Sequence, residues 1–299
     1  MPVNKDESLV KVGERARKWL GANAVVVTGA ESLADMVNVL IGLYLCDILD
    51  GSKGHAESLR VARLLSNYLQ QKRKEPSSEN SSTTLLLIAS RILSLYNLPC
   101  GLLDRFASST AKKIASFGVS VPDEYRGIQL IVNRMGLVKT APEAGIIEEV
   151  DINGGMLGVL LADENRLDGI IDRIYAASLW GTSTIRGNKK ALHELERALV
   201  PVTIQRLRIY DIERGWRLLR SLAYLNVKDK EKLESATRFL KMQQRDDGAF
   251  GYFSYELMNA GILEDAVALR RFYISITVNS LWTVAEVEIP NLRLFLIPV

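Results

Sequence analysis

The chain has 299 residues, with 38 Lys and Arg against 35 Asp and Glu, so its formal net charge of +3 implies no basic face for nucleic acid. Two Cys and two His are too few for a disulfide framework or for the three or four ligands of the usual zinc sites. Apolar residues make up 47% and charged residues 24%, which is typical of a globular chain with a sizeable core.

The N-terminal segment carries no targeting signal. Residues 1–7 are polar and lack the apolar stretch of a signal peptide. The longest apolar run, Met36 to Leu49, is interrupted by Asn38, Gly42 and Asp47, and it is shorter than the roughly 18 residues that a spanning helix needs. We therefore expect no transmembrane segment and a cytoplasmic protein with reduced thiols.

Apolar residues recur at helical spacing through most of the chain, and the alternation typical of strands is scarce. This pattern predicts roughly ten to twelve helices, mostly about 10 to 20 residues long. Capping signals predict helix starts at Ser81–Thr84 and at Thr140–Glu143, the second with capping-box spacing. Residues 75–82 form the one low-complexity stretch and are predicted to be a mobile loop rather than a domain linker.

Turn residues predict where these helices end. The expected breaks lie at Gly51–Gly54, Asn97–Pro99, Val121–Pro122, Asn153–Gly155 and Gly187–Asn188.

The last third of the chain predicts two contrasting helices. Leu233, Ala236 and Leu240 form an apolar stripe flanked by charged residues, which indicates an amphipathic helix with one solvated face. Ala266 to Val287 is apolar almost all round, as in a helix that other helices enclose.

A short pattern recurs along the chain. Ser-Leu followed by an aromatic residue occurs at Ser94–Tyr96, Ser178–Trp180 and Ser280–Trp282, and a looser copy is Ser221–Tyr224. These offsets are compatible with a helical-hairpin repeat of about 42 residues with insertions.

Residues 236–253 carry the most specific pattern in the chain. Phe239-Leu240 is followed by Gln244, then by Asp247-Gly248, then by Phe250-Gly251. A glutamine near a helix end can bond backbone groups that the helix leaves unpaired. Both glycines allow positive φ, and both phenylalanines can pack inward.

This pattern resembles the repeat of terpenoid cyclases and protein prenyltransferases, in which the segment joins an outer to an inner helix of an α/α toroid. The resemblance implies an all-α fold, with residues 1–299 forming a single α/α toroid around a central cavity. About six hairpins would fit this length, although the other hairpins carry no good copy of the motif.

The family's catalytic motifs are missing. No Asp-x-Asp-Asp run of the class II cyclases is present, and the nearest acidic groups are Asp211-Ile212-Glu213 and Asp246-Asp247. Asp168 and Asp172 are spaced i, i+4, where hard cations such as magnesium could bind, but this spacing is weak evidence and a solvated helix face is the favoured interpretation.

The two Cys and two His residues do not support the zinc chemistry of the protein prenyltransferases. We exclude zinc-dependent prenyl transfer, because only two Cys and two His are available and none lies in a motif of the family. Cys46 and Cys100 lie in apolar contexts typical of core thiols. His55 and His193 lie where surface or capping histidines are expected. We expect no metal and no cofactor, with magnesium as the weak exception.

The remaining candidates are carboxylates and aromatic side chains. For acid–base catalysis we select Asp211, Glu213, Asp247 and Glu256. Aromatic faces can stabilise a carbocation, although the same residues can simply fill a core. The expected substrate-binding residues are Tyr175, Trp180, Trp216, Tyr224, Tyr252, Tyr255, Tyr273 and Trp282.

Two functions remain nearly level. The first, slightly ahead, is an atypical cyclase or isomerase of terpenoid-like metabolism that acts on a small apolar molecule in the cavity; it requires a carboxyl of raised pKa in an apolar pocket. The alternative is a non-catalytic ligand-binding or scaffold protein that kept the toroid fold, with the apolar tail Leu292–Val299 as a candidate patch. A homo-oligomer is compatible with either. A carbohydrate-active toroid would need a carboxylate pair that the sequence does not indicate.

Overall fold

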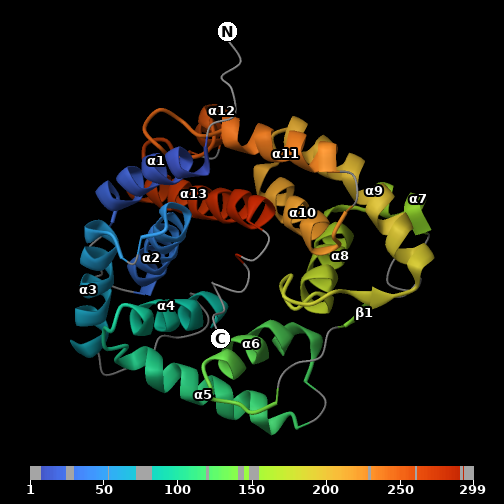
Figure 1. Ribbon diagram of the computed structural model, residues 1–299. Coiled ribbons are helices and arrows are strands. Elements are labelled where there is room, and N and C mark those ends of the chain that lie inside the picture. Colours follow the sequence, from blue (N-terminus) through green and yellow to red (C-terminus); the bar gives the residue numbers. More distant parts are fainter. Residues whose placement is uncertain are drawn as a thin grey trace. The chain divides into compact units, whose positions relative to one another are not determined.

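The computed structural model describes residues 8–24, 30–52, 54–71, 83–118, 121–140, 145–147, 155–227, 230–259, 261–289 and 292. These residues are mostly helical (Figure 1), as the sequence predicts. The expected loop at 75–82 and the apolar tail beyond Leu292 lie outside the described residues. Within the described part of the chain, eleven helices have twelve residues or more and two have six.

The chain divides into two compact units. Unit 1 comprises residues 1–110 and 241–285, and unit 2 comprises residues 111–240 and 286–299. Because each unit draws on separate stretches of sequence, the chain passes from one unit to the other three times. The prediction of a single toroid over residues 1–299 stays a prediction.

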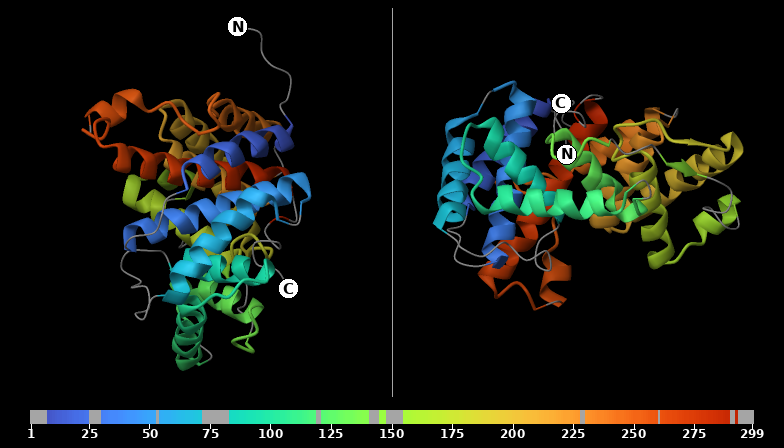
Figure 2. Two further views of the ribbon diagram at one scale, coloured as in Figure 1. Left: turned by 90° about the vertical axis from the view of Figure 1, so that its left-hand side faces the viewer. Right: turned by 90° about the horizontal axis from the view of Figure 1, so that it is seen from below.

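Unit 1 is built from the first and the last helices of the chain. Its helices are α1 (Leu9–Ala22), α2 (Ala30–Asp50), α3 (Ala56–Gln71), α4 (Thr83–Leu95), α12 (Ser254–Asn259), the first part of α5 (Leu102–Ser116) and most of α13 (Ala266–Glu288). Helix α2 contacts α1, α3 and α4, and α1 also contacts α3. Two further views show α1, α2 and α3, in shades of blue, side by side (Figure 2).

Unit 2 contains the middle helices and a minimal sheet. Its elements are α6 (Asp123–Arg134), β1 (Ile146–Ile147), α7 (Gly155–Leu160), α8 (Glu164–Ala177), β2 (Arg186–Gly187), α9 (Lys189–Arg208), α10 (Ile212–Tyr224) and most of α11 (Lys230–Met242), together with the end of α5 and the end of α13 from Glu286. Helix α8 contacts α6 and α10, while α9 contacts α7 and α10. In both units, helices separated by one element along the chain touch, which is how stacked helical hairpins pack.

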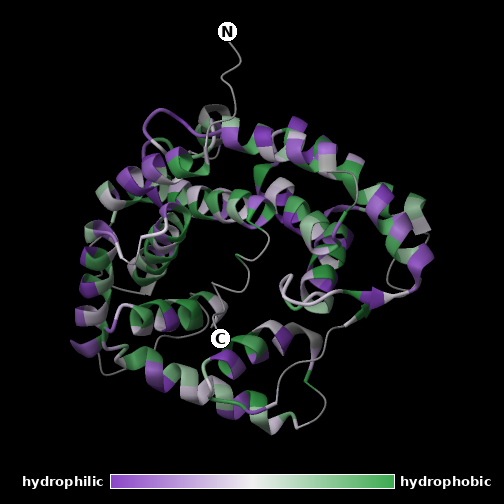
Figure 3. Cartoon of the chain, viewed as in Figure 1, coloured by the Kyte–Doolittle hydropathy of each residue, from purple (hydrophilic) through white to green (hydrophobic). Residues whose placement is uncertain are grey.

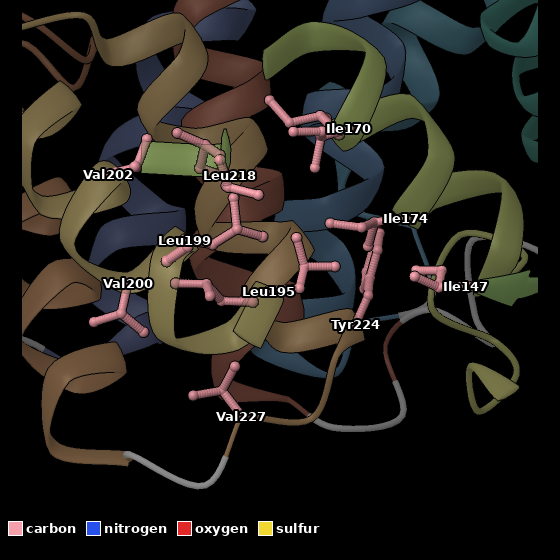
Figure 4. Close-up of a cluster of buried hydrophobic side chains, with 14 of the residues drawn as sticks. Ile147, Ile170, Ile174, Leu195, Leu199, Val200, Val202, Leu218, Tyr224 and Val227 are labelled. Carbon is pink, nitrogen blue, oxygen red and sulfur yellow. The ribbon is translucent and has the colours of Figure 1, made fainter. Parts of the chain in front are cut away.

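The core of unit 2 lies between α8, α9 and α10. Figure 4 shows Ile170 and Ile174 of α8 facing Leu195 and Leu199 of α9, with Leu218 of α10 among them. The side chains of α8 and α9 recur at i and i+4, so each of these helices turns one apolar stripe inward.

Helix α2 combines a high hydropathy with a central place in unit 1. Residues Ser32–Asp50 are long and apolar enough, by length and composition, to cross a membrane, contrary to our expectation that no run is long enough. Two thirds of this stretch is buried within the protein, and Figure 3 shows α2 as mostly hydrophobic. Contacts with three neighbouring helices account for an apolar surface on nearly every side.

One predicted helix start is wrong. The capping-box signal at Thr140–Glu143 predicts a helix, but residues 141–144 lie outside the described part and Ile146–Ile147 form β1. Two β-branched residues favour an extended backbone, and β1 pairs in parallel with Arg186–Gly187. Strands of two residues are too short to show an alternating pattern, so the sequence did not reveal them.

The predicted breaks agree with the described helix ends. Helix α2 ends at Asp50, α4 at Leu95, and α9 begins after Asn188, whose side chain caps it by accepting from the Lys190 N–H. The amphipathic α11 and the enclosed α13 also occur where they are predicted.

The Ser-Leu-aromatic pattern occupies the same structural position in three of its four copies. Three copies lie at the C-terminal ends of α4, α8 and α10, where Asn97, Trp180 and Asn226 have positive φ. The copy at Ser280–Trp282 lies inside α13, so it does not share this position and the pattern does not mark one repeating unit.

The hairpin at residues 244–251 has the geometry that its sequence predicts. The Gln244 Nε2 group donates to Val12 O at 3.0 Å and to Gly248 O at 3.1 Å, and Gln244 Oε1 accepts from Arg15 Nη2 at 2.7 Å. Phe250 is fully buried and donates its N–H to Thr277 Oγ1. The glutamine thus satisfies backbone carbonyls and also holds the hairpin against α1.

A buried carboxylate on the apolar α2 joins this helix to α1, to α3 and to the turn after α4. Asp47 accepts from Arg17 Nη2 at 3.1 Å, from Ser58 Oγ at 2.9 Å, from the Tyr96 hydroxyl at 2.7 Å and from the His55 N–H at 3.2 Å. Both oxygens therefore have two donors, which offsets the cost of removing the charge from water.

We expect Gly248→Ala to destabilise the protein by about 2–5 kcal/mol, from strain at positive φ and from overpacking. Gly248 has a φ of +102°, and an added Cβ would collide with Arg15 O. Gly118→Ala is the matched control, since Gly118 has a φ of +64° but its Cβ would meet nothing within 4 Å. Urea denaturation measures both; equal losses would contradict the role of close contact with α1.

We expect Asp47→Ala to cost about 3–5 kcal/mol, because it leaves the buried Arg17 guanidinium without one carboxylate and strands a tyrosine and a serine hydroxyl. Glu14→Ala, at an exposed position on the same unit, should change stability by less than about 0.5 kcal/mol. Thermal and urea unfolding provide the measurement, and similar losses for the two variants would refute the proposed role of Asp47.

Candidate functional site

Helix α10 places three of its large polar or aromatic side chains on one face. Trp216, Arg220 and Tyr224 are spaced i, i+4 and i+8, so they lie above one another along the helix. Asp211 caps the start of the helix by accepting from the Arg214 N–H at 3.3 Å. The helix ends where Asn226 takes a positive φ of 55°.

Arg220 is buried, and its charge is met by a carboxylate. Its Nε atom donates to Glu286 Oε2 at 2.8 Å, and the Tyr224 hydroxyl donates to the same oxygen at 2.7 Å. Arg220 Nη2 also donates to the Tyr224 hydroxyl oxygen at 2.9 Å. Arg220, Tyr224 and Glu286 are 4%, 3% and 2% exposed, so this ion pair and its hydrogen bonds are shielded from water.

Two tyrosine rings face the buried guanidinium. Arg220 Cζ lies 5.3 Å from the ring centroid of Tyr175 and 5.8 Å from that of Tyr224. The two rings meet edge to face with their centroids 5.0 Å apart. Figure 4 shows the Tyr224 side chain beside Ile174, at the edge of the unit 2 core. The cation that these aromatic faces stabilise is therefore Arg220 itself.

The two tyrosines and the arginine of this cluster are unsuited to proton transfer near neutral pH. Burial raises the pKa of Tyr175 to about 12, and although Arg220 acts in the opposite direction the phenol remains protonated. Burial and Glu286 raise the pKa of Tyr224 well above its usual range, although Arg220 opposes them. Burial lowers the pKa of Arg220, but Glu286 and the tyrosines outweigh it and leave that pKa raised, so the guanidinium stays charged.

The two remaining aromatic candidates of unit 2 are Trp180, which contacts Tyr175, and Trp216, which lies one turn before Arg220 on α10. Trp180 packs edge to face on Tyr175 with 6.2 Å between ring centroids, and its backbone has a φ of 55°. Trp216 is half-buried, and its indole N–H is buried without a hydrogen-bond partner in the described part of the chain. The structure thus brings Tyr175, Trp180 and Tyr224 together.

The predicted catalytic carboxylates have local partners. Asp211 caps α10 and pairs with Arg206 at 3.3 Å and with Arg214 at 3.4 Å, while Glu213 lies exposed in the first turn of that helix. Asp247 accepts from the Ala249 N–H at 3.0 Å and pairs with Arg245. The side chains of Glu256 and Tyr255 lie outside the described residues.

The remaining aromatic candidates belong to unit 1. Tyr273 is buried with Arg245 Cζ at 4.7 Å from its ring centroid, and it contacts Phe253 and Phe272. Trp282 is buried, whereas Tyr252 is 58% exposed. The ring face of Tyr273, which was predicted to contact a substrate, is therefore covered by Arg245.

The carboxylate pair on α8 also meets an arginine. Arg217 Nη1 lies 2.7 Å from Asp168 Oδ1, and Arg217 Nη2 lies 2.8 Å from Asp172 Oδ1. Among the residues that the structure describes, no group of three or more His, Cys, Asp and Glu side chains is placed to hold a metal ion.

The cysteines and histidines occupy the positions expected of them. Cys46 and Cys100 are buried, and burial raises the pKa of Cys46 to about 12. His55 caps α3, with its Nδ1 accepting from the Glu57 N–H at 3.4 Å, and His193 is exposed on α9.

Arg220 and Glu286 are the residues that the sequence interpretation missed. Arg220 follows Leu218-Leu219, and Glu286 lies between Ala285 and Val287 in an otherwise apolar helix. A charged residue inside an apolar helical stripe indicates a buried pair, because a buried charge requires a partner. That signal was available for both residues.

Comparisons with protein families, with curated proteins and with solved structures find no match to this chain.

We expect Glu286→Ala to destabilise the protein by about 3–5 kcal/mol, because it leaves the Arg220 guanidinium buried without its carboxylate. The double variant Arg220→Met/Glu286→Leu should recover most of that loss, since well-packed apolar side chains can replace a buried ion pair. Urea denaturation of the wild type, Arg220→Met, Glu286→Leu and the double variant gives the coupling energy. Additive effects of the two changes would show that the pair is not coupled.

Proposed function

We propose that the protein is a non-catalytic binding or scaffold protein built from stacked helical hairpins. The observation that carries this proposal is that the tyrosine faces of Tyr175, Tyr224 and Tyr273 are already opposed by arginines of the chain. An aromatic face that stabilises an internal guanidinium is not available to a carbocation.

The acidic residues support the same choice. A cyclase or isomerase of the expected kind needs a carboxyl whose pKa is raised in an apolar pocket. The carboxyls of described residues whose pKa is shifted, those of Asp50, Glu57 and Asp265, are shifted downward. For Glu57 the hydrogen bond from Arg60 is the main cause, and for Asp265 the backbone N–H groups of Ala268 and Val267 are.

The finer fold assignment is part of this proposal. We propose that the hairpins form an α/α toroid like that of the terpenoid cyclases. The hairpin of Gln244, Gly248 and Phe250 supports it, because each residue has the contact that the motif implies. Contacts between alternate helices in each unit support it too. The cavity, the cytoplasmic location and the small apolar ligand stay predictions.

The proposal predicts neither turnover nor specific stabilisation by terpenoid substrates. We expect geranyl, farnesyl and geranylgeranyl diphosphate, each with magnesium, to give no hydrocarbon or alcohol product by gas chromatography–mass spectrometry. We also expect no rise in melting temperature, whereas a ligand at 100 times its Kd would stabilise the protein by about 2.7 kcal/mol. Product formation that Asp211→Asn or Asp247→Asn abolishes, while Asp163→Asn does not, would contradict the proposal and restore the cyclase hypothesis.

A further inference from the structure

The exposed face of α9 has a charge of one sign. The residues of this helix that are exposed include Lys189, Lys190, Arg197 and Arg208, together with His193, and none is acidic. The two glutamates of α9, Glu194 and Glu196, are half-buried. Arg197 and Arg208 form no ion pair with any residue that the structure describes. A surface of this kind attracts acidic partners.

An apolar cleft opens beside this face. Its walls are Val200, Thr203 and Ile204 of α9 and Leu233 and Ala236 of α11, with Leu222 beneath them. Lys232 is the charged residue among those that line it. Ile204 is 36% exposed at the rim, while Leu222 is 3% exposed. The cleft is therefore apolar in its floor, with Lys232 at its edge.

The size of the cleft decides what can enter it. Its free volume is about 10 Å³, about that of one water molecule, whereas small-molecule sites span roughly 300–1,000 Å³. A space of this size accepts the tip of one apolar side chain. Phosphate groups of a nucleic acid carry no such tip, so the combination of cleft and cations favours a protein segment.

The positions along α9 match a helical partner. Arg197, Ile204 and Arg208 are separated by seven and by four residues, so they fall on one side of the helix with the cleft between the two arginines. A helix packed alongside would present acidic residues to both arginines and one apolar residue to the cleft, as in helix-in-groove recognition.

We propose that the exposed face of α9, with the cleft between α9 and α11, binds an acidic amphipathic helix of a partner protein. This inference rests on the proposed function, because it assigns the partner class of a binding protein. The terminal methyl group of one apolar side chain enters the cleft, and glutamates of the partner pair with Arg197 and Arg208.

The test uses labelled 18-residue helical peptides and the full chain. One peptide carries glutamates on one face with a central leucine, a second replaces that leucine by serine, and a third replaces the glutamates by lysine. We expect fluorescence anisotropy to show binding of the first peptide and at least about fivefold weaker binding of the second. No binding of the first peptide, or equal binding of the lysine peptide, would overturn the proposal.

The binding site is located by comparing two double variants that change the net charge equally, one on α9 and one elsewhere. Arg197→Glu/Arg208→Glu should weaken the acidic peptide at least tenfold, and Ile204→Ser should reduce the difference between the leucine and serine peptides. Lys18→Glu/Lys112→Glu, at exposed positions elsewhere, is the control and should retain most of the affinity. Equal losses in the two charge variants would overturn the proposal, as would unchanged binding in both.

Other occupants give distinct results. Binding to vesicles of phosphatidylserine and phosphatidylcholine that Arg197→Glu/Arg208→Glu abolishes, with no peptide binding, would overturn the proposal and assign the surface to a lipid membrane instead. Self-association lost in the same variant, again without peptide binding, would overturn it in favour of a second copy of the chain. Neither result depends on turnover of prenyl diphosphates, so the failure of this inference and the failure of the proposed function are separable.

Discussion

A guanidinium buried beneath two tyrosine rings requires a carboxylate, and Glu286 supplies it to Arg220 at 2.8 Å. The Arg220 guanidinium sets the positions of three elements within unit 2. It binds the last turn of α13 through Glu286, it belongs to α10, and it lies over the Tyr175 ring of α8. The constraint also supports the proposed function. Aromatic side chains that could have lined a reaction cavity serve instead to enclose a charge that belongs to the fold.

Unit 1 also contains a buried charge that is bound by groups of opposite or complementary polarity, but here the buried charge is negative. Asp47 lies on the most apolar of the long helices and is stabilised by donors from α1, α3, the turn before α3 and the turn after α4. In both units the buried charge is fully engaged in holding helices together. Polar groups that are committed in this way contribute to specificity of packing and leave few titratable groups for chemistry.

Much of the helical architecture could be predicted from the sequence. Periodicity identified α11 and α13, and Asn188 and the turn after Asp50 marked helix ends, because caps and breaks are local properties. The hairpin at Gln244 was predictable for the same reason. The strand at Ile146–Ile147 was missed because its partner lies about forty residues away and neither strand is long enough to show a period.

The candidate site was predictable only in its parts. Tyr175 and Tyr224 were selected because aromatic faces can stabilise a cation, and the structure does place them together. What they face could not be inferred, because Glu286 is separated from Arg220 by 66 residues and no local pattern links the two. Distance along the chain, rather than residue type, limited the interpretation.

The division of the chain has a consequence for how the protein is made. Unit 1 begins with α1, yet its hairpin partner Gln244 follows 229 residues after Arg15, and its last residue is Ala285. At a synthesis rate of 5–20 residues per second, roughly 9–35 s separate the completion of residue 110 from that of residue 285. Within this interval the carbonyl of Val12 lacks its partner until Gln244 is made, and Arg220, once made, lacks its carboxylate until Glu286 follows 66 residues later. Neither unit is therefore complete until α13 has been synthesised, and water solvates those groups in the meantime.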